Sequence, residues 1–99
     1  MSDRKTLFIT GASTGIGAAT ARAAVDAGWT VGLMARSADK LATLQDEFGD
    51  ACHVVPGDAT DLAAQEAAIT STVETFGGID AAFANAGTGL DTPGTENGD

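Results

Sequence analysis

The stretch Thr10–Gly17, TGASTGIG, places three glycines between an apolar run and an alanine-rich segment. Such a sequence is typical of a turn that joins a β-strand to an α-helix. Gly11 can adopt a backbone conformation that a Cβ would disfavour, while Gly15 and Gly17 let another group approach the backbone closely. The N–H groups of the first helical turn and the helix dipole point toward this turn, so the stretch is suited to bind a phosphate. Taken alone, it is also compatible with a tight connection that binds no ligand.

Around this turn, short β-branched runs alternate with longer segments of helical period, the pattern of βαβ units with a parallel sheet. We predict strands at about 6–10, 30–35, 52–56 and 80–84, and helices at 16–27, 38–48 and 62–76. Right-handed crossovers place the first three strands side by side, and a reversal after the third gives the order 3-2-1-4. In such a sheet the crevice between strands one and four, beyond their carboxyl ends, is the place where ligands bind.

Residues with capping preferences support the helix bounds. Ser37 and Asp61 stand where N-caps of the second and third helices are expected. Gly28, Gly49 and the pair 77–78 follow the three helices, as C-terminal glycines do. The predicted apolar faces are Leu41, Leu44 and Phe48 in the second helix, and Leu62, Ile69, Val73 and Phe76 in the third.

Composition excludes several classes of function. Five basic residues against 14 acidic ones give a formal net charge of -9, which disfavours nucleic acid and anionic membrane as partners. The single cysteine, Cys52, is expected to be a small core residue, and the single histidine, His53, a strand residue far from the crevice. No Cys/His cluster has metal-ligand spacing. A signal peptide and a membrane span are both missing from the 99 residues, so a cytoplasmic protein is expected.

Four motifs then resemble the classical short-chain dehydrogenase/reductase family. The GxxxGxG glycines of TGASTGIG resemble its nucleotide loop, GWTVGLMAR its second strand, PGDATD the turn after the third strand, and FANAG the motif after the fourth. The resemblance implies an α/β fold with a partial Rossmann-type parallel sheet flanked by three helices. It also implies a cofactor-binding portion at residues 1–87, followed by a flexible acidic tail at 88–99.

The family pattern implies a cofactor role for thirteen residues. Those around the diphosphate and its ribose are Gly11, Ser13, Thr14, Gly15, Ile16 and Gly17. Local turn hydrogen bonding is the alternative role of the two hydroxyls among them. Asp58 would approach the adenine amino group with Ala59 against the ring, while Asn85, Ala86 and Gly87 would pass near the ribose and nicotinamide.

The end of the second strand indicates which dinucleotide is preferred. A carboxylate there would bind the ribose hydroxyls of NAD, but this chain has Ala35. Arg36 and Ser37 follow, and a guanidinium beside a hydroxyl resembles the members of the family that prefer NADP. The alternative is a solvated arginine beside a helix cap.

The family's proton-transfer residues are missing from this chain. The family reduces carbonyls or oxidises alcohols with a Ser and a Tyr-x-x-x-Lys motif, but the 99 residues contain no tyrosine. We therefore expect the chain to be the cofactor-binding portion of a longer NADP(H)-dependent oxidoreductase, truncated before its catalytic segment and inactive alone, with an open sheet edge at the fourth strand. Full-length relatives are usually homo-oligomers, but the helices that pair them are not in this sequence. A non-catalytic nucleotide-binding or interaction protein is the alternative.

Overall fold

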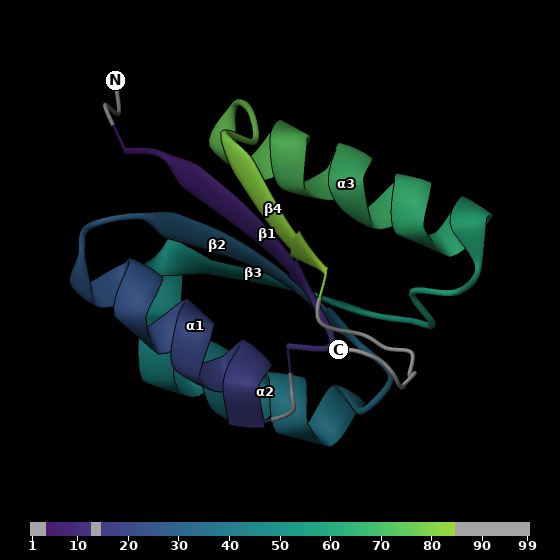
Figure 1. Cartoon of the computed structure of the whole chain (residues 1–99), viewed down its shortest axis with the longest axis horizontal. Coiled ribbons are helices and arrows are strands. Elements are labelled where there is room, and N and C mark those ends of the chain that lie inside the picture. Colours follow the sequence, from purple (N-terminus) through teal and green to yellow (C-terminus); the bar gives the residue numbers. More distant parts are fainter. Residues whose placement is uncertain (1–3, 13–14, 85–99) are drawn as a thin grey trace, which may run out of the picture.

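The computed structural model describes residues 4–12 and 15–84, which form one parallel sheet with helices on both faces (Figure 1). The strand order is β3-β2-β1-β4, as the sequence predicts. The elements in chain order are β1 (Thr6–Thr10), α1 (Gly15–Asp26), β2 (Thr30–Ala35), α2 (Ala38–Phe48), the 3-10 turn η1 (Gly49–Ala51), β3 (Cys52–Pro56), α3 (Leu62–Phe76) and β4 (Ala81–Ala84). The predicted α/β fold is thereby confirmed.

The element ends agree with the predictions to within one residue, because local chemistry sets them. The Ser37 hydroxyl accepts a hydrogen bond from the Lys40 amide at 3.3 Å, and the Asp61 carboxylate accepts one from the Ala63 amide at 3.0 Å. Helix α1 begins and ends one residue earlier than predicted, β4 begins one residue later, and η1 was not predicted.

Helices α1 and α2 cover one face of the sheet and α3 covers the other (Figure 1). The strand residues of β2 alternate between the two faces, so Val31 and Leu33 meet α1 and α2, whereas Met34 meets α3. The buried residues of the first core are Ile9, Ala12, Ala21, Val31, Leu33, Ala35, Leu41, Leu44 and Cys52. The second core is smaller, with Phe8, Met34 and Ala68 buried at its centre.

The predicted apolar face of α3 is wrong at Leu62 and Val73 but right at Ile69, which packs against the second core. Leu62 is 75% exposed and Val73 is 39% exposed, whereas Ala68 and Thr72 are the buried residues of this helix. The reason is close packing: a Cβ added to Gly32 in β2 would lie 2.5 Å from side-chain atoms of Thr72. A helix that approaches a sheet this closely presents small residues to it, so large apolar residues do not mark the contact.

Strand β4 forms one edge of the sheet. Its residues 81–84 pair in register with residues 7–10 of β1, and no second neighbour of β4 exists within residues 4–12 and 15–84. Ala81, Ala82 and Ala84 are exposed, and Phe83 is partly buried. The open edge that the topology predicts is thus present in the part of the chain that the structure describes.

Candidate functional site

Backbone hydrogen bonds bring three loops together at the carboxyl ends of the strands. The Ala12 amide donates to the Met34 carbonyl at 3.2 Å, which holds the glycine turn against the end of β2. The Gly57 amide donates to the Ala35 carbonyl at 2.8 Å, which holds the turn after β3 on the other side of β2. Residues from the glycine turn, from the loop at 36–37 and from the turn at 57–60 therefore share one edge of the sheet, where open α/β sheets bind their ligands.

Gly11, at the start of the glycine turn, has the backbone conformation that its sequence position predicts. Gly11 has a φ of 67°, in the left-handed region that favours glycine. Gly17 is buried within α1, so the helix packs closely at its start. Ser13 and Thr14, two of the predicted cofactor contacts, lie outside the described residues.

Gly15 differs from these two glycines, because nothing in the described chain requires a glycine there. A Cβ built on Gly15 meets no atom within 4 Å, and its φ is not in the left-handed region. The first turn of α1 also contains no acidic residue, whereas that of α2 contains Asp39. The open space at Gly15, at a helix start where the first-turn amides have no acceptor within the helix itself, fits an anionic group, such as a diphosphate, against the backbone.

Ile16 is 67% exposed at the start of the same helix. Its side chain is one of the few large apolar groups on the surface of the described residues, beside the glycine turn. This exposure is compatible with the predicted contact to a cofactor, and single exposed apolar side chains are also common in proteins.

A cation, Arg36, directly follows the end of β2. Ala35 is 5% exposed, and the next residue, Arg36, is exposed. Arg36 makes no hydrogen bond or ion pair with any other described residue. The hydroxyl of Ser37 accepts the capping bond from Lys40, which leaves its own proton available for donation to a ligand.

Asp58 is held by a neighbour that the sequence analysis did not single out. Its Oδ1 accepts hydrogen bonds from the Thr60 hydroxyl at 2.7 Å and from the Thr60 amide at 2.9 Å. These bonds, together with the positive charge of Arg36, hold the pKa of the Asp58 carboxyl below its usual value. Because the group is exposed and ionised at neutral pH, it can accept a hydrogen bond from a ligand.

The remaining predicted residues lie on or beyond this edge. Ala59 is partly buried and packs against the Phe8, Met34 and Ala68 cluster. Ala84 lies opposite Thr10, so β4 ends beside the glycine turn. Asn85, Ala86 and Gly87 lie outside the described residues.

Two predictions about residues without a predicted cofactor role are confirmed. Asp61 caps α3 through the amides of Ala63 and Ala64. His53, in the edge strand β3, forms a hydrogen bond with the Ser71 hydroxyl of α3 at 2.5 Å. Within the described ranges, no group of three or more His, Cys, Asp or Glu residues could hold a metal ion. Nor does any helix there combine the length and apolar character that a membrane span requires.

A family model described as short chain dehydrogenase matches residues 5–98. The chain belongs to the short-chain dehydrogenase family. Among curated members, 1,2-dihydroxy-1,2-dihydronaphthalene dehydrogenase of Pseudomonas putida is 39% identical over 87 residues, which are 88% of this chain and 34% of that protein. The chain spans about a third of the length of the curated short-chain dehydrogenases that it matches.

Solved structures of the family agree with the fold. The 3-ketoacyl-(acyl-carrier-protein) reductase of Brucella melitensis, complexed with NADH, is 29% identical with a TM-score of 0.76, and the match covers 79% of this chain and 32% of that one. The C-domain of a bacterial malonyl-CoA reductase, with NADP, is also 29% identical with a TM-score of 0.76 over 85% of this chain and 15% of that one. Proteins similar in structure to this chain have thus been solved with either dinucleotide.

Proposed function

We propose that this chain is the cofactor-binding portion of an NADP(H)-dependent short-chain dehydrogenase/reductase that acts on a carbonyl or alcohol substrate. Membership of the family and the related structures with NADH and NADP support binding of a nicotinamide dinucleotide. The proposed contacts are the thirteen residues predicted from the sequence. The division of the chain into a binding portion at residues 1–87 and a tail at residues 88–99 stays a prediction, and the family match extends to residue 98.

The observation that carries the preference for NADP is the state of Arg36. Its guanidinium is exposed and without a hydrogen-bond partner among the described residues, and the position before it is an alanine rather than a carboxylate. An arginine fork binds phosphate oxygens in a bidentate manner, whereas the ribose hydroxyls of NAD would find no acceptor at Ala35. The hydroxyl proton of Ser37 supplies a second donor to the same phosphate.

The bound dinucleotide would supply or accept the hydride, and the residues of this edge would orient the dinucleotide. The open backbone at Gly15 and the amides of α1 would hold the diphosphate, Arg36 the 2′-phosphate and Asp58 the adenine. The 99 residues contain no tyrosine, so the family's proton donor must come from outside them, and we expect this chain alone to be inactive. A cytoplasmic location is part of the same proposal.

Calorimetric titration of the chain with NADP and with NAD tests this function. We expect NADP to bind about tenfold more tightly, the effect of one charge-assisted contact on an exposed site. Arg36→Asp should abolish or reverse this preference, because it places a carboxylate beside the 2′-position. Lys40→Asp is the matched control: it makes the same change of charge one turn into α2 and should leave most of the preference in place.

Equal affinity of the unmodified chain for both dinucleotides would contradict the role of Arg36. Absence of binding to either one would contradict the function as a whole.

A second candidate is a non-catalytic nucleotide-binding or interaction protein, favoured by the absence of tyrosine from the sequence. The two candidates differ in what lies outside these residues. A longer reading frame with a Tyr-x-x-x-Lys motif supports the oxidoreductase, and a 99-residue product in cells supports the alternative.

A further inference from the structure

We draw no further inference here: the strongest candidate, the apolar surface that Leu62 and Val73 expose along α3, carries no proposal because nothing in the part of the chain that the structure describes shows what covers it.

Discussion

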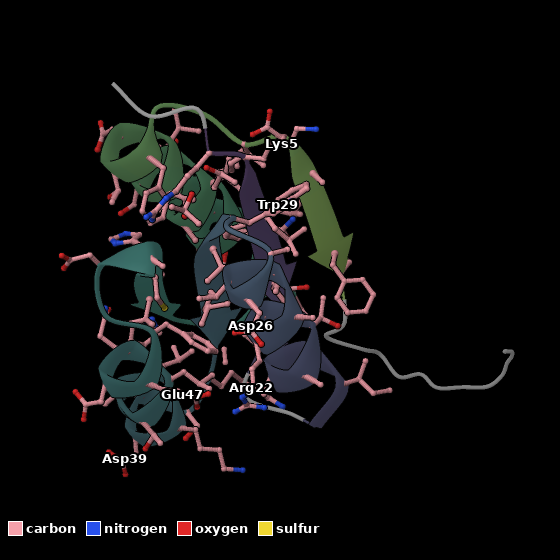
Figure 2. All side chains as sticks on the ribbon, turned by 90° about the vertical axis from the view of Figure 1, so that its left-hand side faces the viewer. Lys5, Arg22, Asp26, Trp29, Asp39 and Glu47 are labelled. Atoms are coloured by element: carbon pink, nitrogen blue, oxygen red, sulfur yellow. The ribbon has the colours of Figure 1, made fainter. Side chains whose placement is uncertain are left out.

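At the amino ends of the strands, polar groups form hydrogen bonds with one another. At the carboxyl ends, several polar groups have no hydrogen-bond partner among the described residues. The Thr6 amide donates to the Asp80 carboxylate at 2.8 Å, and the Asp80 amide donates to the Thr6 carbonyl at 2.9 Å. The hydroxyls of Thr6 and Thr30 share a buried hydrogen bond of 2.7 Å. The Lys5 ammonium lies 5.8 Å from the centre of the Trp29 ring, and Figure 2 shows the two side chains together at this end.

At the carboxyl ends, the guanidinium of Arg36 and one oxygen of Asp58 have no hydrogen-bond partner among the described residues, and Gly15 faces open space. Polar groups that are satisfied within the chain contribute to stability. Groups that are positioned but unsatisfied retain their capacity for a ligand. From this difference we infer that the carboxyl ends of the strands form the proposed binding site, whereas the amino ends hold the strands together.

Another interaction within the chain joins the two helices on one face of the sheet. Arg22 of α1 and Glu47 of α2 form a two-point ion pair, with nitrogen–oxygen distances of 2.6 and 2.9 Å (Figure 2). Their hydrogen bond raises the pKa of Arg22 and lowers that of Glu47. Because both side chains are exposed, the pair contributes little stability.

The largest expected effect comes from Gly32, in the middle of β2. A change there should destabilise the whole sheet, including both its amino and its carboxyl ends. Gly32→Ala places a Cβ 2.5 Å from Thr72, whose rotamer is fixed by a hydrogen bond from its hydroxyl to the Ala68 carbonyl. We expect a loss of about 3 kcal/mol of unfolding free energy, measured by urea denaturation followed through Trp29. Thr72→Ala should rescue the variant by removing the atoms in the way.

The matched control is Gly78→Ala, since a Cβ at Gly78 meets nothing within 4 Å. A Gly32→Ala chain as stable as this control would contradict the close packing of α3 on the sheet.

Asp80→Ala should show that stability depends on the amino ends of the strands and NADP binding on the carboxyl ends. The substitution removes the carboxylate that binds the Thr6 amide, and we expect a loss of about 2 kcal/mol of unfolding free energy. The affinity for NADP, measured where the variant is folded, should not change. Arg36→Ala should show the opposite pattern, with weaker NADP binding and unchanged stability. If Asp80→Ala weakened NADP binding as much as Arg36→Ala, the two ends would not be independent.

Most of the fold was predictable because short-range chemistry marks the element ends. The capping side chains of Ser37 and Asp61 and the glycines with positive φ, at 28, 49 and 77, bound the helices. The contact face of α3 was not predictable from apolar periodicity. It depends on the fit of Thr72 against Gly32, a pairing between residues far apart in the sequence.

The candidate site likewise contains residues that were predicted from the sequence and one that was not. Asp58 and Arg36 were identified by resemblance to family motifs, whereas Thr60 was missed. Its two bonds to Asp58 depend on the conformation of a turn rather than on any periodic pattern. The Asp-x-Thr spacing was the available signal, since an aspartate often accepts hydrogen bonds from the residue two positions later.

The smallest effect concerns Cys52, which begins β3 at the amino ends and is 6% exposed. Burial raises the pKa of its thiol from 9.0 to about 12. The folded chain therefore keeps the proton as pH rises above 9, while the unfolded chain loses it, so stability is full below pH 9 and falls from there to pH 12. Between pH 8 and 10 we expect a loss of about 1.4 kcal/mol of unfolding free energy that Cys52→Ala does not show.

The same thiol tests the comparison of the two ends. At pH 8 it should react slowly with an alkylating reagent, and its reaction rate should be higher in Asp80→Ala and unchanged in Arg36→Asp. Equal acceleration by both variants would mean that the amino and carboxyl ends open as one unit, and would contradict the division of the sheet into a stabilising end and a binding end.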